Sequence, residues 1–176
     1  MTEVDDAMSG GVSPRTEMYG RVLIDHSQFS LISSDVQSFP ELMDPGQLVA
    51  SCDNCLIISG VSNGTYAGVR VVIHEPRKNF EFDADDESWH LEDSTVIKFT
   101  APAFFMTGDT LEFGIDDTLR GTIVNEGEYR VWARIRGGAE SVEKYLMGER
   151  DLPAQERMPV SDLIQQFRID IVRTAD

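Results

Sequence analysis

The sequence predicts an all-β fold, an antiparallel β-sandwich of jelly-roll or Ig-like type with about seven to nine short strands and one short helix. Three observations support this prediction. Short runs of apolar and β-branched residues recur along the chain, turn sequences such as SNGT, TGDT and NEG separate them, and only one segment has a helical period. The 176 residues, of which 41% are apolar, are enough for one domain with a buried core.

The chain is expected to begin with a flexible leader over residues 1–18, because this stretch is polar, contains glycine and has no period. A single β-sandwich domain then spans residues 19–176. Its first segment, YGRVLIDHSQFSLIS, alternates apolar and polar residues on both sides of a bend near His26. Two strand pieces are therefore predicted there.

The next segment, SFPELMDPGQLVAS, contains Pro40, Pro45 and Gly46, which exclude a long regular helix and allow short helical turns beside a loop. Strand patterns become frequent from Leu56 onward. The expected strands are CLIISGV, AGVRVVIHE, KNFEFD, STVIKFTA, TLRGTIV, EYRVWARIR and FRIDIVR.

One helix is predicted in AESVEKYLMGE. Val142, Tyr145 and Leu146 recur there at the spacing of one helical face, and Gly148 follows as a stop signal.

The strand EYRVWARIR has one basic face, because its alternation places Arg130, Trp132, Arg134 and Arg136 on the same side. Such a ladder can bind a carboxylate, a sugar or a phosphate. The alternative is that the arginines pair with acidic strands such as FDAD, with Trp132 under their aliphatic stems. In the terminal FRIDIVR, the apolar residues are likewise expected inward and the Arg and Asp outward.

The chain is strongly acidic, with a formal net charge of −16. A field of this sign repels nucleic acid and anionic lipid, and it attracts basic proteins and cations. The densest part is EFDADDESWHLED, residues 81–93, which has seven carboxylates in thirteen positions and no Lys or Arg. This stretch is a solvated loop, a metal site or a surface for a positively charged partner. The overall acidity is also consistent with a saline habitat or with solubility alone.

No residue pattern indicates catalysis, a metal or a cofactor, so we expect a protein that is not an enzyme. GxSxG, HExxH, P-loop, GxGxxG and EF-hand patterns are all missing from the sequence. Cys52 and Cys55 form one CxxC pair, which we interpret as structural thiols, with a disulfide left open. His26, preceded by Asp25, is expected to bond the backbone at a strand bend.

The sequence has no pattern of a secretion signal and no apolar run near the ~18 residues of a membrane span. We therefore expect a cytoplasmic protein without a membrane partner.

Several segments resemble, in sequence and order, those of the competence protein J family. They are DHSQF, GVSNGTYAGVRVVIHEP, KFTAPAFFMTGDTLEFGID, RGTIVNEGEYRVWARIRGG and the terminal FRIDIVR. The similarity covers about residues 20–173 and is anchored in the stretches around His26 and Trp132. Members of that family inhibit the DNA-entry nuclease, so the resemblance implies an inhibitor whose partner is a nuclease.

We therefore predict a non-enzymatic acidic binding protein of nuclease-inhibitor or immunity type that blocks a basic protein partner through an acidic surface. Its carboxylates would occupy a cation-lined cleft in place of nucleic acid, with Trp89 as an anchor. The predicted partner-binding residues are Asp83, Asp85, Asp86, Glu87, Trp89, Glu92, Asp93, Asp116 and Asp117. The alternative is a small-ligand or carbohydrate-binding β-sandwich module, with Arg130, Trp132, Arg134 and His26 as its ligand-binding residues.

Overall fold

The computed structural model describes residues 16–40, 46–60, 63–76, 89, 91–108, 113–148 and 151–174. In these ranges the chain is mostly β, as predicted. The strands are β1 (Thr16–Ile24), β2 (Gln28–Ser33), β3 (Val49–Cys52), β4 (Cys55–Ser59), β5 (Thr65–His74), β6 (Leu91–Phe99), β7 (Ala103–Met106), β8 (Gly127–Arg136) and β9 (Gln166–Arg173). The helical segments are η1 (Asp117–Leu119), α1 (Gly138–Leu146), α2 (Leu152–Arg157) and η2 (Val160–Asp162), where η marks a 3-10 helix.

The strands form two sheets. The larger sheet has the order β1-β5-β9-β8-β6, and the smaller sheet has the order β3-β4-β2-β7. Every neighbouring pair is antiparallel except β5 and β9, which are parallel. The prediction of a purely antiparallel arrangement is wrong at this pair. A parallel pair needs a long crossover, and here the chain passes through β6, β7, β8 and both helices before it returns beside β5.

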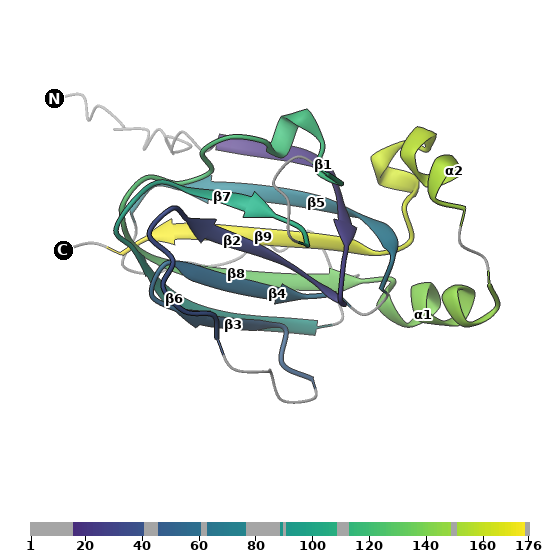
Figure 1. The fold of residues 1–176 in the computed structure, drawn as a ribbon, viewed down its shortest axis with the longest axis horizontal. Helices are drawn as coiled ribbons and strands as arrows, with labels where there is room; N and C mark the ends of the chain where they lie inside the picture. The colour runs from purple at the N-terminus through teal and green to yellow at the C-terminus, as the bar shows by residue number, and fades with distance from the viewer. Residues whose placement is uncertain are drawn as a thin grey trace, which may run out of the picture.

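The two sheets lie face to face over one hydrophobic core (Figure 1). Phe29 of β2 reaches across to the larger sheet, where its ring meets the edge of Phe167 at a centroid distance of 5.1 Å. The predicted alternation is confirmed in β8 and β9, because Val131 and Ile169 are fully buried in this core. The jelly-roll or Ig-like type stays a prediction.

Some predicted element boundaries are wrong. β1 begins at Thr16, so residues 16–18 belong to a strand and not to the leader, whose first 15 residues lie outside the described ranges. Val49–Cys52 forms β3 where we expected a loop. TLRGTIV holds η1 and an isolated bridge at Val124 in place of a strand, because Gly121 adopts a φ of 84° that ends the extended conformation. The predicted strand KNFEFD lies outside the described residues.

The bend near His26 is a two-residue turn that carries the chain from the larger sheet to the smaller one. His26 and Ser27 have φ values of 51° and 61°, and Asp25 and Gln28 exchange backbone hydrogen bonds of 3.2 and 3.0 Å across them. The imidazole is exposed, and its Nδ1 lies 3.1 Å from Asp25 Oδ1. The expected backbone contact of His26 is therefore replaced by a contact with a carboxylate.

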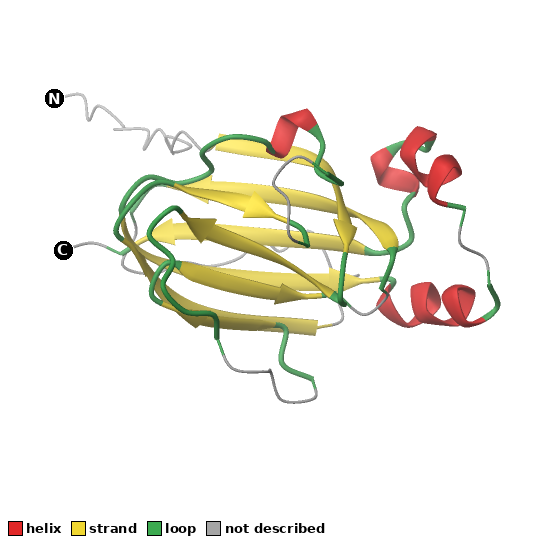
Figure 2. Ribbon diagram, in the orientation of Figure 1, coloured by secondary structure: helices red, strands yellow, loops and turns green. Residues whose placement is uncertain are grey.

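Helices α1 and α2 lie at the same end of the two sheets (Figure 2). The helix predicted from residue 139 is confirmed as α1. Gly138 and Ser141 are its buried residues, whereas the Leu146 side chain is 76% exposed. A face of helical spacing predicts which side chains lie together, and it does not guarantee that a neighbouring element covers them.

Helix α2 was not predicted, because six residues are too few for a clear period. Its start nevertheless has ordinary signals. The Asp151 side chain accepts a hydrogen bond of 3.0 Å from the Ala154 N–H, and Pro153 occupies the first turn. Among the described helices, none has the length and apolar character that crossing a membrane requires.

Candidate protein-binding surface

The acidic stretch 81–93 is described only at its C-terminal end. Trp89 lies beside β8, with its ring centroid 5.8 Å from the Arg134 guanidinium carbon and 5.0 Å from that of Arg136. A cation–π contact of this kind contributes on the order of 0.5–1 kcal/mol at an exposed site. The predicted anchor thus packs on arginines of its own chain. The predicted residues Asp83, Asp85, Asp86 and Glu87 lie outside the described residues.

Glu92 and Asp93 are adjacent in β6 and have opposite environments. Glu92 is exposed on the outer face of the larger sheet, opposite Arg134 in the strand register. Asp93 points the other way, and its Oδ2 accepts hydrogen bonds of 3.0 and 3.1 Å from the backbone N–H groups of Leu48 and Val49. Asp93 therefore joins β6 to the start of β3, while Glu92 faces solvent.

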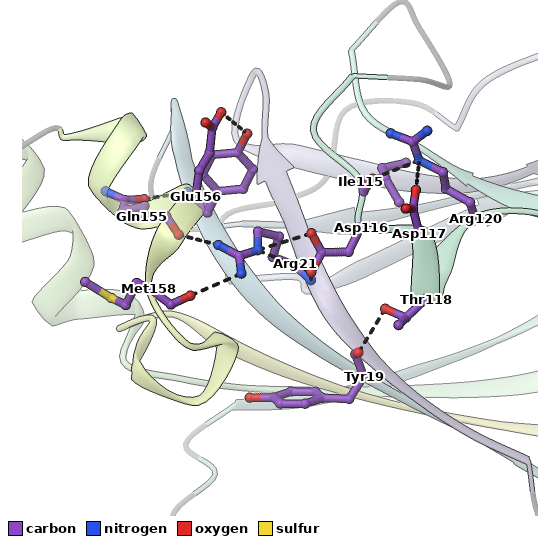
Figure 3. Close-up of polar contacts among 11 residues, drawn as sticks. Tyr19, Arg21, Ile115, Asp116, Asp117, Thr118, Arg120, Gln155, Glu156 and Met158 are labelled. Atoms are coloured by element: carbon purple, nitrogen blue, oxygen red, sulfur yellow. Dashed lines mark hydrogen bonds and ion pairs between the residues drawn. The ribbon is translucent and has the colours of Figure 1, made fainter.

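Asp116 belongs to a polar junction centred on Arg21 of β1 (Figure 3). Asp116 Oδ2 accepts hydrogen bonds from the Arg21 backbone N–H at 3.0 Å and from its Nε at 3.2 Å. The same guanidinium donates to the backbone carbonyls of Gln155 and of Met158, the latter at 3.1 Å. Arg21 therefore ties helix α2 and the loop before η1 to the edge strand β1.

Asp117 is the neighbour of Asp116 but has a different role. Its side chain is 93% exposed and lies 3.4 Å from Arg120. The predicted acidic residues are not all brought together, because Asp116 is held on β1 and Glu92 lies on β6. These are the two edge strands of the larger sheet, four strand spacings or roughly 19 Å apart. A partner that contacts both patches has to span the sheet.

The basic ladder of β8 is confirmed as one face, but its members differ. Arg130 is exposed, with its guanidinium 5.8 Å from the ring centroid of the half-buried Trp132. This contact agrees with the packing of arginine stems on the indole. Arg134 is buried and therefore does not belong to an open platform. His26 is not near this group, because β5 and β9 lie between β1 and β8.

Arg134 belongs to a buried charge cluster on the outer face of the larger sheet. Asp170, fully buried, lies at its centre, and the Arg168 guanidinium donates to it at 2.9 and 3.2 Å. His74 Nε2 lies 2.8 Å from the same carboxylate, and Arg134 Nη2 lies 3.6 Å from it. Arg168 and Asp170 were correctly placed on the outer face, and both are buried there.

The described charges are unevenly divided between interior and surface. Arg21, Arg134 and Arg168 are engaged in the internal contacts above, which withdraws their charge from the surface. The exposed Lys and Arg residues in the described part of the chain are Lys98, Arg120, Arg130, Arg157 and Arg173. The exposed carboxylates there are Glu17, Asp35, Asp53, Glu75, Glu92, Asp117, Glu126, Glu128, Glu140, Glu143, Asp151, Glu156 and Asp162.

A pocket of about 500 Å³ opens at the end of the sheets, between α1 and α2. Tyr66 and Leu163 line it from the sheet side, and Tyr145 and Met158 from the helices. Burial raises the pKa of Tyr66 to about 12, with a further contribution from the hydrogen bond of 2.9 Å that its hydroxyl donates to Glu156. Sequence reasoning missed this pocket, because the six residues of α2 are too few to show a helical period.

A second, smaller pocket of about 260 Å³ lies on the outer face of the larger sheet. Tyr19, Arg70, Trp89, Arg136 and Gln166 are among its lining residues. The Tyr19 hydroxyl donates a hydrogen bond of 3.1 Å to Gln166 Oε1. Aromatic and guanidinium groups therefore do converge on this face, at the end of β8 that carries Arg136 and not at Arg130 and Trp132.

The two cysteines are thiols in directly opposed positions of β3 and β4. Burial, followed by the proximity of Cys52, raises the pKa of Cys55 to about 12. A thiol with this pKa stays protonated and unreactive at neutral pH. Over the part of the chain that is described, no three His, Cys, Asp or Glu side chains gather as metal ligands would.

By its fold, the described part of the chain is a two-sheet, mostly β protein with α1 and α2 at one end. No family model matches it, and no curated protein does. Two solved structures are similar to it. ComJ from Bacillus subtilis, described as an inhibitor of the DNA degrading activity of NucA, has a TM-score of 0.47 and 14% identity over 92% of this chain and 96% of that chain. The protein of crocagin biosynthetic gene J has a TM-score of 0.52 and 12% identity over 92% of this chain and 99% of that chain.

ComJ bears the name of the competence protein J family, which the sequence segments resemble. At these identities the similarity concerns the fold alone.

Proposed function

We propose that this chain is a non-enzymatic binding protein of inhibitor or immunity type that blocks a basic protein partner. The observation that carries the proposal is the division of charge, with arginines drawn into internal clusters and carboxylates left on the surface. Such a surface steers a cationic protein toward it and accelerates association. We assign no catalytic role to any residue.

A nuclease is the partner that this chemistry suits best. A nuclease cleft holds phosphates with cations, so a dense array of carboxylates can occupy it as a competitor of the polyanion. The family resemblance in the sequence implies the same class of partner. In this proposal the stretch 81–93 supplies most of the charge. Among the described residues, Glu92 and Asp117 are the predicted partner-binding carboxylates that face solvent.

The test is a pull-down at low salt from an extract of the source cells, followed by a nuclease assay on each retained protein. One variant carries Asp83→Asn, Asp85→Asn, Asp86→Asn and Glu87→Gln. Its control removes the same charge from exposed positions elsewhere, Asp35→Asn, Asp53→Asn, Glu126→Gln and Glu128→Gln. We expect the parent and the control to retain and inhibit a basic nuclease, and the first variant to lose both properties. Equal retention by all three proteins would contradict the proposed surface.

A second candidate function, binding of a small anionic or sugar ligand, is favoured by the pocket of about 260 Å³ beside Trp89. Here the ligand would meet Arg70 and Arg136 in place of Arg130 and Arg134. Titration with small carboxylates and glycans distinguishes the two functions, because contacts with an aromatic wall persist at a salt concentration that screens an acidic surface. Binding that is lost in Arg136→Gln and kept in Arg130→Gln would support this second function.

A further inference from the structure

Helix α1 leaves much of its apolar surface uncovered. The side chains of Leu146 and Met147 are 76% and 68% exposed, at the point where the helix ends. The pocket between α1 and α2 is lined by other apolar side chains, among them Tyr145 and Met158. Exposed apolar area is typical of a surface that another molecule covers.

The two sides of the pocket have helical spacing. Ser141, Lys144, Tyr145 and Gly148 line one side at i, i+3, i+4 and i+7, all from α1 and the turn after it. Asp151, Ala154, Gln155 and Met158 line the other side at the same spacing, from α2 and its two caps. The sides are therefore two helix faces with an open space between them, which is the geometry of a helix-in-groove site.

The rim of this pocket is acidic. Asp151 and Asp162 line it, and Glu156 accepts a hydrogen bond of 2.9 Å from the hydroxyl of Tyr66, another lining residue. Lys144, which lines the pocket, lies 3.6 Å from Glu140, and Arg157 is an exposed cation at the end of α2. Carboxylates thus predominate over cations among the described rim residues. This charge disfavours nucleic acid and anionic lipid as the occupant, and it favours a basic peptide segment.

We infer that the pocket between α1 and α2 binds an amphipathic basic helix of the partner protein, which lies as a third helix between the two. The apolar face of that helix would enter the pocket toward Tyr66 and Leu163, and its Lys and Arg side chains would reach the acidic rim. A volume of about 500 Å³ lies within the range of roughly 300–1,000 Å³ that is usual for binding pockets. The inference rests on the proposed function, because it takes the partner to be basic.

The groove is held open by contacts that do not depend on a partner. Arg21 bonds the carbonyls of Gln155 and Met158, and the Gln155 side chain accepts a hydrogen bond of 2.8 Å from the Tyr66 backbone N–H. Helix α2 is thereby fixed to β1 and β5. A pre-formed groove lowers the ordering cost of binding.

The test uses a fluorescent peptide of about 14 residues with Leu on one helical face and Lys on the other, and a second peptide with Glu in place of Lys. Ala154→Trp fills the pocket from an exposed position of α2, and Ala139→Trp adds the same side chain to α1 at an exposed position that does not line it. We expect the Lys peptide to bind the parent and Ala139→Trp equally and Ala154→Trp at least tenfold more weakly. Thermal unfolding verifies that both variants fold.

Methionine methyl NMR gives a second readout. The Met158 signal is expected to shift when the Lys peptide is added, whereas the Met106 signal, from β7 in the smaller sheet, is expected to stay in place. Unchanged affinity in Ala154→Trp, or no binding of the Lys peptide to the parent, would overturn the inference. The proposed function is decided separately, since the pull-down uses the natural partner and varies residues 83–87. If the variant at residues 83–87 loses nuclease retention while Ala154→Trp still inhibits the nuclease fully, the proposed function stands and the proposed helix-binding pocket is rejected.

Discussion

His74 and Asp170 lie on the parallel strands β5 and β9, and the imidazole Nε2 of the first is 2.8 Å from the carboxylate Oδ1 of the second. The contact lies on the outer face of the larger sheet, where Arg168 approaches the other carboxylate oxygen at 2.9 Å. One buried carboxylate thus links β5, β8 and β9. The cluster fixes the register of the parallel pair through side chains as well as backbone.

Replacement of Asp170 by Asn is expected to destabilise the protein strongly. The substitution keeps the side-chain volume but leaves Arg168 and Arg134 buried without their central anion, which typically costs about 3–5 kcal/mol. Urea unfolding measures the change. The control Asp53→Asn lies in an exposed turn and should change the free energy of unfolding by less than about 0.5 kcal/mol. Equal urea midpoints for the two variants would refute the role of the cluster.

Replacement of Arg21 by Met is expected to loosen helix α2 while the sheets stay intact. The variant loses hydrogen bonds from a charged donor to Asp116 and to two carbonyls of α2, each worth on the order of 1.5–3 kcal/mol. Hydrogen exchange should accelerate in residues 152–158 and stay slow in β9. Arg21→Lys should not rescue the protection, because a Lys ammonium does not have the geometry of the guanidinium fork. Slow exchange of α2 in both variants would contradict this.

Tyr66 is expected to make the protein sensitive to alkali. Its pKa is raised to about 12 by burial and by Glu156, so its neutral form is favoured in the folded state. The corresponding stability is complete below the unfolded value near pH 10 and is lost as the pH rises toward 12, by about 2 kcal/mol or less. In Tyr66→Phe, the urea midpoint should fall less steeply between pH 9 and 11 than in the parent. Parallel profiles would exclude this contribution.

The two cysteines are expected to react at different rates. Iodoacetamide at pH 8 should label the half-buried Cys52, while Cys55, whose pKa is about 12, should react only after unfolding in urea. Mass spectrometry counts the labels. Cys52→Ser should abolish the fast label, and fast labelling of Cys55 in that variant would show that its burial is incomplete.

Gln165 provides an opportunity to stabilise the fold. Its side chain is fully buried, and neither amide atom has a hydrogen-bond partner in the described structure. Gln165→Leu should therefore raise the free energy of unfolding by about 1–2 kcal/mol, because it removes the cost of an unsatisfied buried amide. Gln155→Leu serves as the contrast, because the Gln155 amide accepts a bond from Tyr66 and its loss should destabilise the protein.

The sequence predicted the features that depend on local alternation. The inward positions of Val131 and Ile169 and the outward positions of Arg130 and Arg168 follow from a period of two. The parallel pairing of β5 and β9 does not follow, because a buried strand has the same pattern in either direction. Helix α2 is too short for a period, so the pocket beside it was also missed.

The candidate site could be predicted only in part, because the environment of a carboxylate depends on distant residues. Glu92 and Asp93 are adjacent and equally acidic, but Asp93 meets the backbone of Leu48 and Val49. Asp116 is likewise engaged by Arg21, which lies 95 positions earlier in the chain. Contacts between residues so far apart in sequence leave no local pattern. The sequence alone therefore cannot distinguish a carboxylate with a structural hydrogen bond from one that is free to bind a partner.

The place of β9 in the sheet has a consequence for the synthesis of this protein. The strand is last in sequence among those described, yet it is inserted between β5 and β8 in the larger sheet. On the ribosome, β5 and β8 therefore remain open edges until the segment 166–173 has left the exit tunnel. The larger sheet is therefore completed only after this last strand has been translated. Chains that stop before residue 166 would leave the unpaired backbone groups of β5 and β8 open to chaperones and to pairing with other chains.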